Sequence, residues 1–140
     1  MAFENPSREH IKELLEAAGN IAVVGLSDKP DRTSHMVAAA LQARGYRIIP
    51  VNPNATSILG ETCYPSLSDI PEPVHIVDVF RRAEEVVPIA EEAVKIGAKV
   101  FWLQTGIINE EAARIAAEGG LEVVMDRCIK VEDAVLRPQR

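Results

Sequence analysis

The sequence contains five short apolar runs, most of them separated by segments in which apolar residues recur at helical spacing. Each run is mostly apolar and too short for a buried helix, which is typical of strands buried on both faces of a parallel sheet. The runs occupy residues 21–24, 47–51, 74–80, 99–103 and 121–125. This alternation predicts an α/β fold: a three-layer, doubly wound parallel sheet of the Rossmann-like type with about five strands.

The segments around these runs supply the helices and one long connection. Helices are expected over residues 8–18, 34–44, 84–96, 109–118 and 131–136. Thr33 or Ser34 is the expected cap of the second helix, because Ser and Thr side chains accept hydrogen bonds from a first turn. Pro50 leaves the last residue of the second strand undetermined, since proline has no N–H to donate to a neighbouring strand. Residues 55–73 are rich in turn formers, and such a connection is usually functional or carries short structure of its own.

Length and charge exclude several classes of function. A chain of 140 residues favours one domain, spanning residues 1–140. Its 21 acidic and 15 basic side chains give a net charge of −6, which disfavours nucleic acid as a partner. No apolar run is long enough to span a bilayer, so no membrane partner is expected. The first residues lack the pattern of a signal peptide, which makes the cytoplasm the expected location.

Neither the cysteines nor the histidines form a recognisable metal or disulfide pattern. Cys63 and Cys128 lie far apart without a CxxC spacing, and His10, His35 and His75 are scattered. No metal site is expected. Cys128 follows the fifth strand near a helix start, where a thiol can have a lowered pKa, although a small half-buried thiol is the alternative. No catalytic constellation stands out.

Ligands of doubly wound sheets bind beyond the carboxyl ends of the strands, near the point where the strand order reverses. After the first strand, Gly25 would allow a tight turn, and the start of the next helix near Ser34 would present N–H groups to a phosphate. The loop departs from GxGxxG, because Ser27 and Pro30 replace the second and third glycines. A glycine needed only for the turn is the alternative interpretation.

The later strand ends add further candidates. NAD-binding folds usually place a carboxylate after the second strand, whereas Asn52 and Pro53 stand here, which would tolerate a ribose carrying a 3′-phosphate. Arg81 and Arg82 follow the third strand, where arginine suits a polyanionic ligand or simply begins a solvated helix. Thr105 and Gly106, after the fourth strand, could bring N–H groups near a ligand.

Several blocks of sequence together resemble the small stand-alone CoA-binding proteins, which are similar to the N-terminal CoA-binding domain of the succinyl-CoA synthetase alpha subunit. The resemblance covers nearly the whole chain, and its most specific blocks are Val-Asn-Pro at 51–53, Cys-Tyr-Pro-Ser-Leu at 63–67 and Trp-Leu-Gln-Thr-Gly at 102–106. It implies a Rossmann-like fold that binds coenzyme A. None of the other domains of the synthetase is present, so synthetase activity is not implied.

The resemblance also assigns positions around the ligand. Gly25, Leu26 and Ser27 would approach the pyrophosphate; Val51, Asn52 and Pro53 would border the adenosine; Phe80 and Arg81 would flank the adenine or its phosphates; Gln104, Thr105 and Gly106 would line the pantetheine side. Charge and loop position add Lys29 and Arg32 as phosphate partners, beside Ser34 at the helix start.

Three hypotheses follow from these residues. The first is a module that binds coenzyme A or an acyl-CoA without catalysis of its own. The second is an NAD(P)-binding oxidoreductase or redox-sensing module, which the fold and Gly25 support and Asn52 does not. The third is a mixed disulfide between Cys128 and coenzyme A. An apolar face on the first helix or in the 55–73 connection would serve a homo-oligomer.

Overall fold

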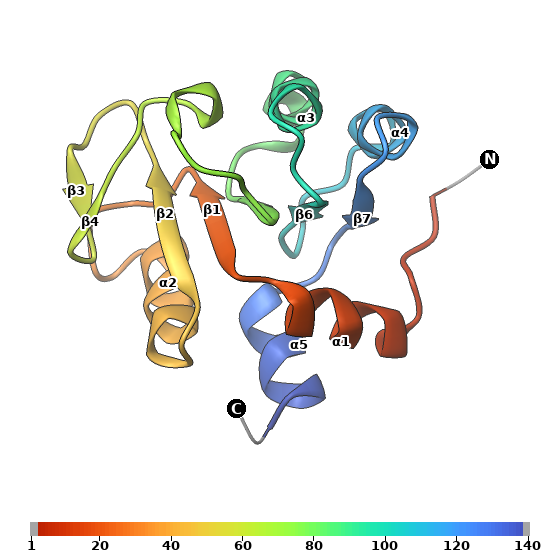
Figure 1. Cartoon of the computed structure of the whole chain (residues 1–140), viewed down its shortest axis with the longest axis horizontal. Helices are drawn as coiled ribbons and strands as arrows, with labels where there is room; N and C mark the ends of the chain where they lie inside the picture. Colours follow the sequence, from red (N-terminus) through yellow and green to blue (C-terminus); the bar gives the residue numbers. More distant parts are fainter. Residues whose placement is uncertain (1–2, 139–140) are drawn as a thin grey trace.

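The computed structural model describes residues 3–138 and contains a five-stranded parallel sheet (Figure 1). Its strands are β1 (Asn20–Val24), β2 (Arg47–Val51), β5 (Ile76–Val79), β6 (Val100–Leu103) and β7 (Glu122–Val124). Their spatial order is β2-β1-β5-β6-β7, and every neighbouring pair is parallel. The chain therefore places β2 on one side of β1 and all later strands on the other, so that the order reverses between β1 and β5.

In the described part of the chain, five helices cover the two faces of the sheet. In Figure 1, α3 (Val86–Lys95) and α4 (Glu110–Glu118) lie above it, and α1 (Arg8–Ala17), α2 (Thr33–Ala43) and α5 (Ile129–Leu136) lie below it. The predicted three-layer, Rossmann-like architecture is confirmed. None of the helices within residues 3–138 is long and apolar enough to cross a membrane.

Alternation along each strand divides the core into two clusters. Val77, Val79 and Phe101 pack with α3 and α4, whereas Ile76 and Trp102 pack with the other three helices. All four residues of β5 and of β6 are buried, because helices cover both faces of these strands. Mostly apolar runs are the sequence pattern that this double burial produces.

The connection after β2 carries short structure of its own, which is one of the two alternatives expected from its length. It contains the small hairpin of β3 (Ser57–Ile58) and β4 (Glu61–Thr62), followed by the 3₁₀ turn η1 (Leu67–Asp69). A second 3₁₀ turn, η2 (Ala83–Glu85), precedes α3. Pro50 lies inside β2, the edge strand of the five-stranded sheet, and its carbonyl accepts from Tyr64 N at 3.0 Å on the side away from β1. The missing proline N–H therefore breaks no bond to β1.

A buried polar network fixes the last helix to the rest of the molecule. Asp133 of α5 is fully buried, pairs with Arg44 after α2, and accepts from the Tyr46 hydroxyl at 2.6 Å. Arg137 donates to the Leu15 carbonyl of α1 at 3.0 Å. The network joins α1, α2 and α5, so it closes the helical layer opposite the carboxyl ends of the strands.

Removing the charge at the centre of this network should destabilise the fold. We expect Asp133→Asn to lower the free energy of unfolding by about 3 kcal/mol, because Arg44 loses the counter-charge of a buried pair. Urea unfolding measures the change. The matched control is Glu118→Gln, which breaks an exposed pair with Arg114 and should cost less than about 0.5 kcal/mol. Equal losses in both variants would contradict this account.

Candidate functional site

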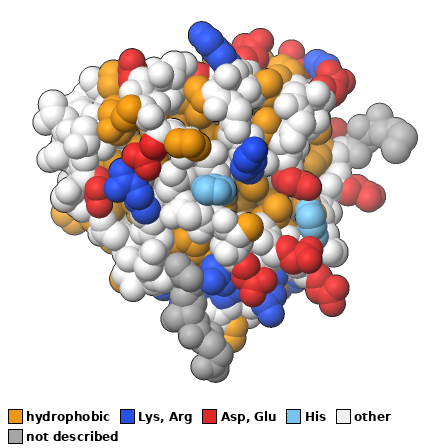
Figure 2. Space-filling model, in the orientation of Figure 1, with side chains coloured by type: hydrophobic (Ala, Val, Ile, Leu, Met, Phe, Trp, Pro, Cys, Tyr) orange, Lys and Arg blue, Asp and Glu red, His pale blue; other side chains and the backbone are white. Residues whose placement is uncertain are grey.

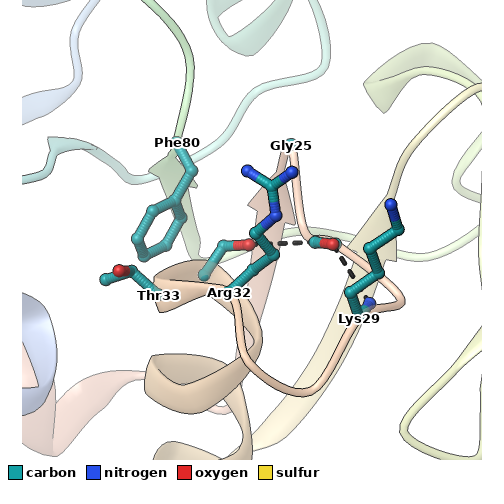
Figure 3. A pocket seen from close by; sticks show the side chains of 7 residues that line it. Gly25, Lys29, Arg32, Thr33 and Phe80 are labelled. Atoms are coloured by element: carbon teal, nitrogen blue, oxygen red, sulfur yellow. Dashed lines mark hydrogen bonds between the residues drawn. The ribbon is translucent and has the colours of Figure 1, made fainter.

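A cavity of about 400 Å³ opens where the strand order reverses, at the carboxyl ends of β1 and β5. Figure 3 shows Phe80 and Thr33 on one side of it, Lys29 on the other, and Arg32 between them. The residues that line it come from the end of β1, the following loop, the start of α2 and the end of β5: Gly25, Ser27, Lys29, Arg32, Thr33, Ser34 and Phe80. All of these except Thr33 are residues that the sequence proposed for ligand binding.

Gly25 lines this cavity, at a point where backbone hydrogen bonds connect the ends of β1, β2 and β5. Its N–H donates to the Val51 carbonyl at 2.9 Å, and the preceding Val24 carbonyl accepts from Phe80 N at 2.8 Å. Gly25 has a φ of +85°, and a Cβ at this position would overlap the Phe80 carbonyl oxygen and lie 2.9 Å from Arg81 Cδ. The glycine is therefore required by the tight turn and by the backbone of β5 crossing beside it.

The loop after Gly25 is held by the first turn of α2. Ser27 N donates to Ser34 Oγ at 3.0 Å, and the Ser27 carbonyl accepts from His35 Nδ1 at 2.9 Å. The Ser27 hydroxyl in turn accepts from Lys29 N at 3.1 Å. These bonds fix the loop that carries Lys29 relative to the helix start.

The start of α2 gives the cavity its positive character. The helix begins at Thr33 with Arg32 at the N-cap, whose side chain makes no capping hydrogen bond. The expectation that Thr33 or Ser34 caps the helix is wrong, because both lie within the first turn and Ser34 binds the Ser27 loop instead. First-turn N–H groups and the exposed cations Lys29 and Arg32 thus surround one space, an arrangement suited to a phosphate group.

Leu26 after β1 and the predicted residues at the end of β2 contribute mainly to structure. Leu26 and Val51 are buried in the two core clusters. Asn52 donates from Nδ2 to the Leu26 carbonyl at 2.9 Å and accepts from Asn54 N at 2.8 Å, so its side chain links the first two strand-end loops. Pro53 is exposed and lines a neighbouring cavity.

Arg81 lies next to the cavity but is held by another residue. Its guanidinium donates to Glu85 Oε2 at 3.0 Å, four residues further on, and this arginine keeps the pKa of Glu85 below its usual value. The side-chain stem of Arg81 passes beside Gly25. Arg81 does not line the cavity in this arrangement.

Gln104 is directed into the core. Its amide donates to Asp78 Oδ1, and both side chains are buried. Burial raises the pKa of Asp78 to about 8, although the Gln104 hydrogen bond acts in the opposite direction. Thr105 and Gly106 are exposed, and Gly106 N donates to Asp126 Oδ1 at 2.7 Å. None of these three predicted residues lines the cavity.

Sequence reasoning missed three residues in or near the carboxyl ends of the strands. Thr33 lines the cavity as the first residue of α2. Asp28 lines the neighbouring cavity together with Pro53. Asp78 is a carboxyl at the centre of the sheet, and a single acidic residue inside a mostly apolar run was the signal that could have revealed it.

The two thiols differ in their surroundings. Cys63 is buried, and burial raises the pKa of its thiol. Cys128 is half-buried at the N-cap of α5 and packs against the same core cluster as Phe80. Within residues 3–138, no group of three or more His, Cys, Asp and Glu side chains could hold a metal ion.

The order of this parallel sheet, with a cation-lined cavity at its switch point, defines the chain as a Rossmann-like α/β protein. Comparison with protein families narrows this class. Residues 19–134 match the family described as "CoA binding domain", and the chain belongs to that family.

Individual proteins of known sequence or structure agree with this assignment. The chain is 52% identical over 135 residues to the Bacillus subtilis protein YneT, in a match that covers 96% of this chain and all of that one. It is 31% identical over 97 residues to acetate–CoA ligase [ADP-forming] II of Archaeoglobus fulgidus, over 68% of this chain and 14% of the ligase. A protein structure from Pyrococcus horikoshii matches with a TM-score of 0.90 and 39% identity, over 97% of this chain and 99% of that one.

Adding one methyl group at Gly25 should disrupt the site and the sheet together. We expect Gly25→Ala to cost more than the ~1–2 kcal/mol of a left-handed alanine, because the new Cβ also meets the Phe80 backbone. Gly60→Ala is the matched control, since Gly60 has a φ of +76° and a Cβ added there would meet no atom within 4 Å. Thermal unfolding compares the two. A loss no larger for Gly25→Ala than for Gly60→Ala would contradict the role assigned to Gly25.

The buried Asp78 carboxyl should make stability depend on pH. Its pKa is raised from 3.8 to about 8 on folding, so the folded protein keeps a proton that the unfolded chain loses. The resulting stabilisation is complete below about pH 4 and is lost as the pH rises towards 8, by up to about 1.4 kcal/mol per pH unit. Asp78→Asn should remove this slope. Urea unfolding of both proteins from pH 5 to 8 measures the difference, and parallel curves would contradict it.

Proposed function

We propose that this protein binds coenzyme A or an acyl-CoA at the carboxyl ends of β1 and β5, without catalysis of its own. The observation that carries the proposal is the cavity at the start of α2, which two cations and a helix N-terminus surround. A diphosphate group placed there would face Lys29 and Arg32 and accept hydrogen bonds from the first-turn N–H groups. The preformed Ser27 loop means that little reorganisation is needed on binding.

The family assignment supports coenzyme A among the diphosphate ligands. The Archaeoglobus fulgidus relative is named as an acetate–CoA ligase, and its matching segment is a small part of that enzyme. The residues that we propose contact the ligand directly are Gly25, Ser27, Lys29, Arg32, Ser34 and Phe80. Arg81 would join them only by leaving Glu85.

The distribution of charge fits one small anionic ligand better than an extended one. Figure 2 shows Lys and Arg side chains scattered among carboxylates on the face that it presents, rather than gathered in one field. The chain carries a net charge of −6, so the two cations of the cavity act locally.

We propose the cytoplasm as the location of the protein, because coenzyme A is available there.

Calorimetric titration with coenzyme A, acetyl-CoA, NAD and NADP tests the proposal. We expect both CoA compounds to bind to a single site, and NAD and NADP to bind more weakly. Binding of NAD without any response to coenzyme A would contradict the proposal and favour a nicotinamide-dependent protein. Native mass spectrometry of freshly purified protein provides a second, independent readout of a bound ligand.

Neutralising either cation of the cavity should weaken binding. We expect Lys29→Gln and Arg32→Gln each to lower the affinity for coenzyme A about tenfold at low salt, which corresponds to about 1.4 kcal/mol of lost charge-assisted interaction. Lys95→Gln is the matched control, since this cation lies on α3 away from the cavity. Equal effects of all three substitutions would show that net charge, rather than this site, controls binding.

A further inference from the structure

A second cavity of about 460 Å³ lies at the end of β2, beside the loop that carries Lys29. It is lined by Asp28 and by residues that follow β2: Pro53, Asn54, Ala55, Thr56 and Ser57. This is the position where the adenosine of a nucleotide lies in doubly wound folds. Its lining offers hydroxyl and amide groups and one carboxylate, but no lysine or arginine.

Asp28 and Lys29, which are consecutive residues of the loop after β1, therefore line different cavities and have opposite charges. Lys29 lines the cavity at the start of α2, and Asp28 lines the cavity at the end of β2. The charge of Asp28 also reaches across to the segment after β2, where it adds to the effect of burial in raising the pKa of the Cys63 thiol. The loop after β1 thus lies between a cavity that favours a phosphate group, at the start of α2, and a cavity that disfavours one, at the end of β2.

The Asp28 carboxylate takes the place of the acidic residue that NAD-binding folds carry at the end of the second strand, which this sequence lacks. Asn52 stands where NAD-binding folds carry the acidic residue that holds the ribose hydroxyls, and its side chain is already engaged with Leu26 and Asn54. Asp28 arrives beside the same strand end from a different loop. A carboxylate there can accept hydrogen bonds from ribose hydroxyls, and it repels a phosphate attached to them.

We propose that Asp28 determines specificity at the adenosine end of the ligand, by favouring a ribose with free hydroxyls over a ribose that carries a 3′-phosphate. The inference rests on the proposed function, because it requires the diphosphate to lie at the start of α2. Among ligands that share the pantetheine arm, it predicts that dephospho-CoA binds at least as tightly as coenzyme A.

The test compares coenzyme A with dephospho-CoA, which differ only in the 3′-phosphate, on the wild-type protein and on Asp28→Asn. We expect the substitution to tighten coenzyme A binding about three- to tenfold at low salt and to change dephospho-CoA binding less than about twofold. The gain should shrink at about 0.5 M salt, since Asp28 is exposed and its field is screened.

Asp31→Asn is the matched control, because Asp31 is exposed in the same loop and lines neither cavity. It should leave the ratio of the two affinities unchanged. An equal change for both ligands in Asp28→Asn, or a ratio that Asp31→Asn shifts as much, would overturn the assignment of Asp28. Failure of both ligands to bind the wild-type protein would instead overturn the proposed function.

Discussion

The structure depends most on the point where β1 ends between β2 and β5. Within two residues the chain bonds both neighbours: Val24 accepts from Phe80 N, and Gly25 donates to the Val51 carbonyl. Only a residue without a side chain fits beside the Phe80 backbone with a φ of +85°. The chain continues to α2 on one face of the sheet after β1 and to α3 on the other face after β5, so a cavity at the carboxyl ends of these two strands is a consequence of the topology.

The sign of the charge changes between two neighbouring cavities that a single loop separates. The chain has a net charge of −6, yet the cavity at the start of α2 is lined by cations and by no carboxylate, and the adjacent cavity is lined by a carboxylate and by no cation. The Ser34 hydroxyl, which accepts from Ser27 N, and His35, which donates to the Ser27 carbonyl, hold the intervening loop in place. A rigid loop can therefore distinguish two ends of one ligand that differ in charge.

The sequence predicted the fold well because burial on both faces leaves a strong pattern, and all five predicted strands begin and end within two residues of the observed strands. Side-chain direction at the strand ends was harder to predict. Arg81 is adjacent to the cavity but meets Glu85 one helical turn later, and Gln104 lies on the same strand face as Trp102 and reaches Asp78. The placement of Asp28 depends on the path of an irregular loop, which no periodicity specifies.

The central claim is that the ligand's diphosphate lies at the start of α2. Nuclear magnetic resonance of the ¹⁵N-labelled protein during titration with coenzyme A tests it most directly, because it reports on each backbone N–H. The account predicts that the largest shifts occur at Ser27, Thr33 and Ser34, with none at the opposite edge around Asn20. Saturable binding with its largest shifts on α3 or α4, and none in the first turn of α2, would contradict it.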